Sequence, residues 1–366
     1  MKICILQGAF LPVPPHLGGA CEKMWFGLGS EFVRQGHEVV HISRTWGSLP
    51  RHEFIQDVEH VRVDGYDTPS GGLKLKALDL LYTRRALHVV PECDILVTNS
   101  FWAPILARKK LAHRMFVDVQ RMPKGQMRFY GRAARLRANS TPVAEAICAE
   151  LSKSEHHRVV MVPNPLPFHA EVVGLPHDKE QTLLYVGRVH PEKGLHLLLQ
   201  AIRKMAIPWP LKIVGPYQTA QGGGGEAYLR QLTQLASGMD VEFVGPVFNT
   251  EDLNSYYRKA TVFVYPSLAE KGETFGLAPL EAMAWGCIPL VSDLACFKDF
   301  IEDGSNGFIF DHRSPDASGV LVEVLNGIIS RPGIWGDCSR QALRVNETHG
   351  TSKIARLFMD EFAKCR

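Results

Sequence analysis

The chain of 366 residues is longer than one ordinary hydrophobic core requires, so its length predicts two domains. Hydrophobic residues form 45% of the sequence and charged residues 22%, which excludes a disordered chain. The net charge of +3 is uneven: residues 1–165 carry 22 basic and 15 acidic side chains, and the remainder carries 19 and 23.

No run of about 18 apolar residues occurs, and the first ten residues read as a buried strand rather than a cleavable signal. We therefore expect a cytoplasmic protein. The eight cysteines lie far apart without a CxxC pair, so we expect reduced thiols in structural positions.

Short runs rich in valine and isoleucine alternate with amphipathic stretches of helical length, as in βαβ units with parallel sheets. The first half predicts strands at 2–7, 37–43, 58–66, 93–99, 114–120, 135–140 and 159–164, and helices at 20–35, 73–89, 101–111 and 142–153. Prolines then predict an inter-domain linker over 163–181. The second half predicts strands at 182–188, 211–216, 241–246, 262–267, 288–293 and 307–311, and a last helix at 351–364. The pattern indicates an α/β fold with two doubly wound, Rossmann-like domains.

Two features stand out in the first half. Gly18 and Gly19 follow the first strand, where they would let the backbone approach a phosphate or sugar closely, or form a bare tight turn. Residues 121–137 contain six basic side chains and no acidic one, which suits an anionic membrane, an acidic acceptor or a solvated basic surface. A helix here would place three of them on one face: Arg128, Arg132 and Arg135.

Two cations follow the first strand of the second domain, in the motif GRVHPEKG (187–194). Arg188 and Lys193 are expected on a strand-to-helix turn at the carboxyl edge of the sheet, where open α/β sheets bind ligands. Together they can stabilise a departing diphosphate without a metal. The alternative is that each is an ordinary surface charge near a helix start.

The chemically richest stretch is EKGETFGLAPLEAMAWGCIPLVSD (270–293). Glu273 and Glu281 bracket a loop that feeds a helix, and their carboxylates can accept hydrogen bonds from hydroxyls of a sugar and of a ribose. The backbone N–H groups at the helix start suit a diphosphate. These groups belong to Phe275, Gly276 and Leu277.

Together with GGA (18–20), GHEV (36–39), PNPL (163–166) and FVGPVFNTEDLNSYYRKATVFVYPS (243–267), these motifs follow an order that resembles the family-four retaining glycosyltransferases of GT-B architecture. The resemblance spans both halves and is strongest from 181 to 311. It implies two Rossmann-like domains facing each other across a cleft. Residues 1–166 would bind the acceptor, 167–345 would bind a nucleotide-sugar, and a helix in 346–366 would cross back to the first domain.

The same resemblance implies roles for single residues. Glu281 would bind the ribose hydroxyls and Glu273 the transferred sugar, while Arg188 and Lys193 would hold the diphosphate. Further donor contacts would come from the residues around the first-domain turn and from two that flank the base: Gly18, Gly19, Val247 and Phe248.

Two positions depart from the family pattern. Cys21 follows GGA where members commonly have glutamate, and Glu22 comes one position later. Gln120 and Arg121 stand where many members have a histidine near the donor sugar. With His16, these two residues are candidate sugar or acceptor contacts.

The sequence thus predicts a retaining hexosyltransferase that uses a UDP- or GDP-linked donor. Its acceptor would be a sugar, a lipid-linked or a small molecule, as in envelope polysaccharide or glycolipid synthesis. No metal, other cofactor or nucleic-acid partner is expected, because no Asp-x-Asp, HExxH or Cys/His cluster occurs. Residues 121–137 offer peripheral contact with the inner face of an anionic membrane.

Two alternatives keep the fold but change the role. A nucleotide-sugar epimerase would need an acid–base set around the sugar, which the motifs do not supply. A non-catalytic nucleotide-sugar-binding protein would not require both glutamates and both cations. A third candidate, a pyridoxal-type phosphorylase, would need a far longer chain.

Overall fold

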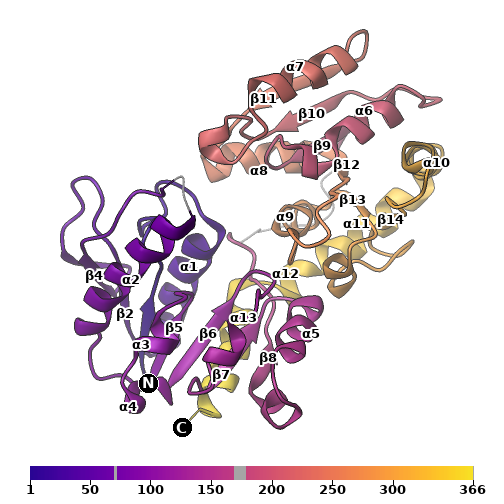
Figure 1. Cartoon of the computed structure of the whole chain (residues 1–366). Helices are drawn as coiled ribbons and strands as arrows, with labels where there is room; N and C mark the ends of the chain where they lie inside the picture. Colours follow the sequence, from indigo (N-terminus) through magenta and orange to yellow (C-terminus); the bar gives the residue numbers. More distant parts are fainter. Residues whose placement is uncertain (70–71, 169–178, 366) are drawn as a thin grey trace. The chain divides into compact units, whose positions relative to one another are not determined.

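The structure, a computed structural model, describes residues 1–69, 72–168 and 179–365. Two compact units form: unit 1 consists of Met1–Phe168 and His349–Arg366, and unit 2 of His169–Thr348 (Figure 1). The sequence places these boundaries after 166 and after 345, and most of its predicted linker, 169–178, lies outside the described residues. Each unit is a doubly wound α/β domain, which confirms the predicted fold class.

The sheet of unit 1 has the strand order β3-β4-β2-β1-β5-β6-β7-β8 and is parallel except between β3 and β4. The strands are β1 (Lys2–Leu6), β2 (Glu38–Arg44), β3 (His52–Ile55), β4 (Val58–Val63), β5 (Ile95–Thr98), β6 (Met115–Val119), β7 (Arg135–Ala138) and β8 (Val159–Met161). The α-helices are α1 (Ala20–Arg34), α2 (Gly72–His88), α3 (Ala103–Leu106), α4 (Lys109–Ala112), α5 (Thr141–Ala149) and α13 (Thr351–Ala363). Two 3₁₀ helices are η1 (Met127–Phe129) and η2 (Lys153–Arg158).

Successive side chains of a strand point to opposite faces of the sheet, so unit 1 has a core on each face. On one face, Ile3 and Ile5 pack with α1 and with α13, which returns from the far end of the sequence. On the other face, Cys4 and Leu6 pack with α2 and with the short helices α3 and α4. Unit 1 is therefore built from two segments that are distant in sequence.

Unit 2 has a parallel sheet of order β11-β10-β9-β12-β13-β14. Its strands are β9 (Glu180–Val186), β10 (Leu211–Val214), β11 (Val241–Gly245), β12 (Ala260–Tyr265), β13 (Ile288–Ser292) and β14 (Phe308–Phe310). The α-helices are α6 (Leu195–Ile202), α7 (Gly225–Leu235), α8 (Thr250–Lys259), α9 (Leu277–Ala284), α10 (Ala317–Ile329), α11 (Trp335–Leu343) and α12 (Val345–Thr348). The 3₁₀ helices are η3 (Pro191–Lys193), η4 (Thr219–Gln221), η5 (Ala295–Asp299) and η6 (Pro332–Ile334).

Two local features of unit 1 differ from the sequence prediction, and the helix considered for 121–137 does not form. The edge strand β3 was not expected, and the helix expected at 101–111 is broken into α3 and α4 because Ala107 between them is extended. The segment 121–137 is not a helix: Gly125 has a positive φ of 91°, and the chain forms η1 and then β7. Arg128, Arg132 and Arg135 therefore share no helical face.

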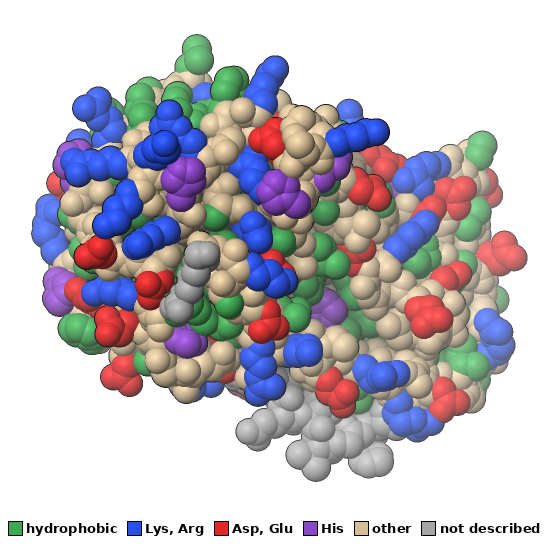
Figure 2. Space-filling view, turned by 90° about the horizontal axis from the view of Figure 1, so that it is seen from below, with side chains coloured by type: hydrophobic (Ala, Val, Ile, Leu, Met, Phe, Trp, Pro, Cys, Tyr) green, Lys and Arg blue, Asp and Glu red, His purple; other side chains and the backbone are tan. Residues whose placement is uncertain are grey.

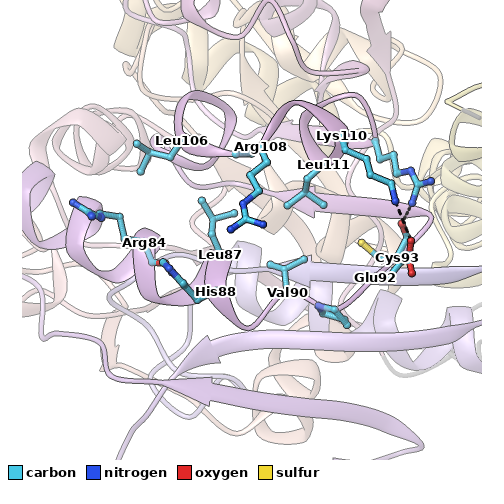
Figure 3. A pocket seen from close by; sticks show the side chains of 13 residues that line it. Arg84, Leu87, His88, Val90, Glu92, Cys93, Leu106, Arg108, Lys110 and Leu111 are labelled. Carbon is cyan, nitrogen blue, oxygen red and sulfur yellow. Dashed lines mark hydrogen bonds and ion pairs between the residues drawn. The ribbon is translucent and has the colours of Figure 1, made fainter.

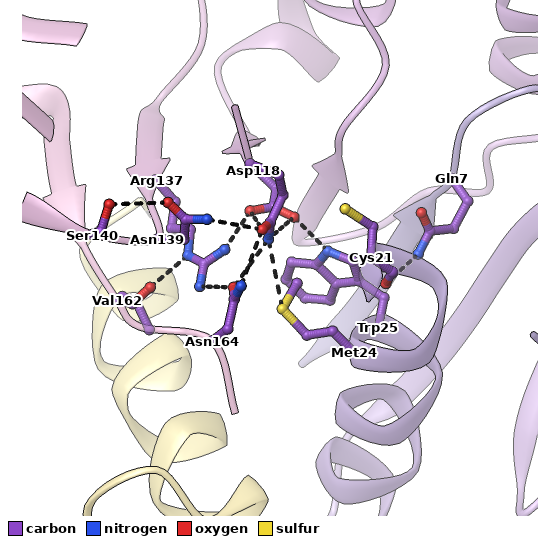
Figure 4. Close-up of polar contacts among 11 residues, drawn as sticks. Gln7, Cys21, Met24, Trp25, Asp118, Arg137, Asn139, Ser140, Val162 and Asn164 are labelled. Atoms are coloured by element: carbon purple, nitrogen blue, oxygen red, sulfur yellow. Dashed lines mark hydrogen bonds and ion pairs between the residues drawn. The ribbon is translucent and has the colours of Figure 1, made fainter. Parts of the chain in front are cut away.

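A buried polar network crosses the carboxyl edge of the unit 1 sheet (Figure 4). Asp118 of β6 and Arg137 of β7 form an ion pair with Oδ1 and Nη1 2.6 Å apart, and both side chains are 0% exposed. Asp118 Oδ2 accepts a hydrogen bond from the indole of Trp25 on α1 (2.7 Å), and Arg137 donates to Asn164 Oδ1 (2.8 Å). The network ties α1, two strands and the end of the first chain segment together.

We expect Asp118→Asn to lower the free energy of unfolding by about 3–5 kcal/mol, because it leaves the buried charge of Arg137 uncompensated. Urea unfolding measures this change. Asp64→Asn is the matched control, since Asp64 and Arg51 form an exposed pair with side chains 60% and 67% exposed, whose loss costs about 0–1 kcal/mol. Equal losses in the two variants would contradict the assignment.

Two buried histidines lie side by side on β2 and β4. His41 and His60 are both 0% exposed and stack with ring centroids 5.3 Å apart. Their ring nitrogens have no hydrogen-bond partner within the described residues. Burial and the nearby charge of Arg62 lower the pKa of His60 to about 4, although Glu53 opposes the shift. Burial, with the charges of His60 and Arg62, lowers the pKa of His41 as well.

A depressed folded-state pKa makes stability depend on pH. Because an unfolded histidine titrates near 6.5, the unfolded chain binds more protons than the folded chain between about pH 6.5 and pH 4. Stability should therefore fall as the pH falls through this window, and His60→Phe should remove part of the loss. Thermal unfolding at pH 7.5 and pH 5 tests this, with exposed His113→Phe as control. If His60→Phe keeps the wild-type pH dependence, this explanation fails.

Candidate active site

In the unit 2 sheet, β9 and β12 are neighbours, and the strand order changes direction between them. Open α/β sheets bind ligands at the carboxyl ends of the strands at such a point. The loop after β9 carries Arg188 and Lys193, and the loop after β12 carries Glu273. Two motifs that lie 80 residues apart in the sequence therefore meet at one edge of the sheet.

Lys193 and Glu273 form a largely buried ion pair. Lys193 Nζ lies 2.7 Å from Glu273 Oε2, and the two side chains are 8% and 12% exposed. The same carboxylate oxygen accepts hydrogen bonds from the hydroxyls of Tyr265 (3.1 Å) and Ser267 (3.4 Å). Burial and the charge of Glu273 raise the pKa of Tyr265, so its hydroxyl stays a donor. These three partners thus hold Glu273 in one position, and the charge of Lys193 balances that of its carboxylate.

Glycine is required where this loop enters α9. Gly276 has a φ of 88°, and a Cβ there would lie 2.3 Å from a ring carbon of Phe297. The helix begins at Leu277, within the stretch where a helix start is expected, while the ring of Phe275 packs against Phe300 with centroids 5.5 Å apart. Of the three residues expected to offer N–H groups, one opens the helix and two precede it.

Glu281 lies in the second turn of α9. Its Oε2 accepts a hydrogen bond from the hydroxyl of Tyr257 on α8 (2.9 Å). Burial, together with the charge of Glu281, raises the pKa of Tyr257. The tyrosine therefore donates to the carboxylate and fixes its orientation, and Glu281 itself stays partly exposed.

Arg188 is already engaged by its neighbours. Its Nη2 lies 2.7 Å from Glu192 Oε1, and its Nη1 donates to the carbonyl oxygen of Gly222 (2.6 Å). Gly222 belongs to the glycine run after β10, which packs on this loop through a hydrogen bond from Gly224 N–H to the carbonyl of Val189 (2.8 Å). The Arg188 side chain is 42% exposed, so it remains accessible to a ligand.

The two residues expected beside the base lie in the loop between β11 and α8. Val247 is half-buried, and Phe248 is 67% exposed. The next residue, Asn249, caps α8 by accepting hydrogen bonds from the N–H groups of Glu251 (2.9 Å) and Asp252 (3.1 Å). The cap fixes the loop and leaves the Phe248 ring available for stacking.

A second charge cluster anchors the loop that carries Glu273. Glu270 receives a bidentate pair from Arg313, with Nε–Oε1 at 2.8 Å and Nη2–Oε2 at 3.0 Å, and a further contact from His312 (2.9 Å). Arg313 also donates to the carbonyl oxygen of Asp293 (2.9 Å). The hydrogen bonds from Arg313 lower the pKa of Glu270, so the pair stays charged. The β12–α9 loop is thereby tied to the loop after β14.

Three of the unit 1 candidates lie in the loop after β1: His16, Gly18 and Gly19. Gly18 and Gly19 have φ values of 77° and 95°, and a Cβ on Gly19 would lie 2.1 Å from Glu22 Oε2. Burial raises the pKa of Glu22, against the opposing charge of Arg121. His16 is exposed and stacks on Trp46 with centroids 5.5 Å apart. Gly19 therefore leaves room for a carboxylate of the chain itself.

Two buried arginines hold this loop in place. The guanidinium of Arg62, 0% exposed at its side chain, donates to the carbonyl of Val13 (3.0 Å). Arg44 donates to the carbonyl of Phe10 (2.9 Å). Arg44 lies on β2 and Arg62 on the neighbouring strand β4, so the sheet sets the conformation of this loop.

Gln120 joins the network of Asp118 and Arg137 through its own hydrogen bonds. Its Nε2 donates to both carboxylate oxygens of Asp118 (3.0 Å each), and its Oε1 accepts from the amides of Asn139 and Asn164 (3.2 Å each). Its amide is thus oriented by at least three neighbours. Arg121, the next residue, is exposed.

Sequence reasoning missed the side chains that hold the two glutamates and two cations. Tyr265 and Ser267 at the end of β12, and Tyr257 on α8, occur inside apolar or ordinary helical runs. The sequence shows these residues only as tyrosines and a serine within the motif 243–267, and their type does not reveal which side chain they contact. The sequence shows Glu192 and Glu270 only as charged residues and does not reveal which cations they pair with.

The described residues offer neither a metal-binding cluster nor a spanning helix. No group of three or more of their His, Cys, Asp or Glu side chains is placed to hold a metal ion. No helix in the described part of the chain is long and apolar enough to cross a membrane.

Comparison with known proteins identifies relatives of this chain. The family model "Glycosyl transferases group 1" matches residues 170–327. An uncharacterized glycosyltransferase of Methanocaldococcus jannaschii is 34% identical over 357 residues, covering 87% of this chain and 87% of the relative. A D-inositol 3-phosphate glycosyltransferase of Arthrobacter sp. is 27% identical over 338 residues, covering 85% of this chain and 74% of the relative.

Solved structures show the same fold over the whole chain. Sucrose-phosphate synthase from Thermosynechococcus elongatus has a TM-score of 0.78 at 19% identity, with 100% of both chains covered. Anabaena HepE in complex with UDP and glucose has a TM-score of 0.74 at 16% identity, again with 100% of both chains covered. With the two doubly wound domains, these likenesses show the GT-B fold. The chain belongs to the group 1 glycosyltransferases.

Proposed function

We propose that the chain is a retaining, metal-independent hexosyltransferase that uses a nucleotide diphosphate sugar. The observation that carries this proposal is the buried Lys193–Glu273 pair at the switch point of the unit 2 sheet, beside the start of α9. A cation, a fixed carboxylate and a helix start at one sheet edge suit a diphosphate joined to a sugar.

The proposed reaction balances without a redox partner or a metal. The bond between the sugar's anomeric carbon and the diphosphate oxygen breaks, and a bond to the acceptor oxygen forms on the same face. The acceptor's proton passes to the departing diphosphate. Lys193 and Arg188 stabilise the charge that develops on the diphosphate, Glu273 binds a hydroxyl of the transferred sugar, and Glu281 binds the ribose.

The donor proposal is a UDP- or GDP-linked hexose. A protein of the same fold holds UDP and glucose, which supports a nucleotide diphosphate sugar here. Exposed Phe248 offers a stacking surface for the base. An assay with both kinds of donor decides the identity of the base.

We propose that unit 1 binds the acceptor, which is a sugar, a lipid-linked or a small molecule in envelope polysaccharide or glycolipid synthesis. The excess of basic side chains in residues 1–165 suits an anionic acceptor. A relative named as a D-inositol 3-phosphate glycosyltransferase also supports a negatively charged acceptor. Contact of 121–137 with an anionic membrane would use four cations at or near the surface: Arg121, Lys124, Arg128 and Arg132.

The direct test is an assay with UDP- and GDP-hexoses, with and without candidate acceptors, in the presence of EDTA. We expect nucleotide diphosphate release that depends on an acceptor, survives EDTA and gives a product with the donor's anomeric configuration. Interconversion of the donor without transfer would indicate an epimerase. Binding without turnover would indicate a non-catalytic protein, and activity restored only by Mg²⁺ or Mn²⁺ would refute metal independence.

Arg188→Gln and Lys193→Met should each lower kcat by ~10²–10³, because each removes a donor to charge that develops in the transition state. Lys193→Met also leaves the Glu273 carboxylate without its ion-pair partner, so it should destabilise unit 2. The double variant Lys193→Met/Glu273→Gln separates the effects: it should regain stability but not activity. Wild-type turnover in both single variants would remove these cations from the mechanism.

Glu281→Gln should weaken binding of free nucleotide diphosphate by roughly 10- to 150-fold, since charge-assisted hydrogen bonds to the ribose contribute about 1.5–3 kcal/mol. The amide oxygen of the substituted side chain can still accept the hydrogen bond from Tyr257, so the fold is kept. Glu273→Gln should leave nucleotide affinity intact or raise it, because it frees the charge of Lys193, but it should impair turnover. Calorimetric titration measures both, with exposed Glu242→Gln as control. Equal losses for Glu273 and Glu281 would overturn the division of roles.

A further inference from the structure

Unit 1 has a cavity far from the sheet edge that carries its site candidates. It has a volume of about 590 Å³ and lies between the end of α2 and the helices α3 and α4 (Figure 3). Cys93 and Arg114, which line it, precede β5 and β6, whereas Gln120 follows β6. In a parallel sheet the amino and carboxyl ends of the strands form opposite edges. The cavity is therefore separate from the candidate active site.

The lining combines aliphatic surface with positive charge. Its apolar side chains are Leu87, Val90, Pro91, Leu106, Ala107 and Leu111. Its basic side chains are Arg84, His88, Arg108, Lys110 and Arg114. The one acidic side chain in the lining, Glu92, is already paired with Lys110 at 3.2 Å. His88 contributes the one aromatic ring in this lining.

Arg108 is the cation best placed to meet a ligand. Figure 3 shows its guanidinium among Leu87, Val90 and Leu111. Arg114, by contrast, donates to the carbonyl of Cys93 (2.7 Å). Within the described residues, neither Arg108 nor Arg84 has an acidic partner. A guanidinium without an anion that lies against aliphatic side chains is suited to bind a negatively charged group attached to a hydrocarbon.

The surface around the cavity is also positively charged. Figure 2, which views the molecule from below, shows Lys, Arg and His side chains gathered over unit 1. The segment 84–114 is rich in Lys and Arg and contains two acidic side chains, Glu92 and Asp94, and Asp94 accepts a hydrogen bond from the backbone of Lys2. This charge attracts anions to the mouth of the cavity.

We propose that the cavity binds a single-chain amphiphilic anion: an aliphatic chain that ends in a carboxylate. The chain contacts Leu87, Leu106 and Leu111, and the carboxylate pairs with Arg108, with Arg84 nearby. The volume falls in the range of pockets that enclose small molecules, roughly 300–1,000 Å³. A free sugar would leave the aliphatic lining unused, and a nucleotide would lack a flat aromatic platform. The proposal is independent of the proposed transferase activity.

Calorimetric titration of the full chain with octanoate, decanoate and dodecanoate, each below its micelle-forming concentration, tests the proposal. We expect one binding site, with affinity rising roughly four-fold for each buried methylene until the cavity is filled. Decanol, which has a chain without the charge, should bind at least about ten-fold more weakly than decanoate. Inorganic phosphate should not compete, because it has no chain.

Arg108→Met removes the charge and keeps apolar bulk, and because the side chain is exposed the variant should fold normally. It should weaken decanoate binding by about ten-fold or more, while Arg132→Met, at an exposed site elsewhere on unit 1, should not. Unchanged affinity in Arg108→Met, equal binding of decanol, or no heat with any chain length would overturn the proposal. Binding to phosphatidylglycerol vesicles without binding of monomeric decanoate would also overturn it, in favour of a membrane-docking surface.

Discussion

The ion pair between Lys193 and Glu273 joins two loops that the chain builds far apart. Each loop follows a strand at the reversal of the unit 2 sheet, so the topology brings them together before any ligand is present. Burying a lysine or a glutamate alone costs free energy, because the charge loses its hydration. Burying the two as an ion pair offsets much of this cost, so the pair holds both loops in position. Tyr265 beneath them and the Glu270–Arg313 pair beside them extend the same constraint to the start of α9.

This arrangement also gives each of the two cations an acidic partner within the protein. Glu273 satisfies Lys193, and Glu192 satisfies Arg188. A ligand that carries both a diphosphate and a sugar hydroxyl can replace these internal partners with its own groups. In the function proposed above, a ligand that carries only one of them would leave the other protein group less well satisfied, which would favour an intact donor over its fragments.

The sequence was sufficient to predict every parallel strand of both sheets and the motifs at the unit 2 edge, because hydrophobic period and turn residues are local signals. It failed where tertiary contacts decide the structure. The basic side chains of 121–137 were evident, but nothing local shows that Arg137, on the predicted strand, is buried and paired with Asp118. Likewise, no local pattern links Tyr257 to Glu281 or Glu270 to Arg313, since these partners lie on separate elements.

The return of α13 to unit 1 has a consequence for synthesis on the ribosome. Phe358 and Phe362 complete the core on one face of the unit 1 sheet, and they are made after the whole of unit 2. Unit 2, whose residues are contiguous, can close its own core while that face is still uncovered. Unit 1, whose first segment is translated before unit 2, is thus completed after unit 2, and until then its apolar face can bind a chaperone.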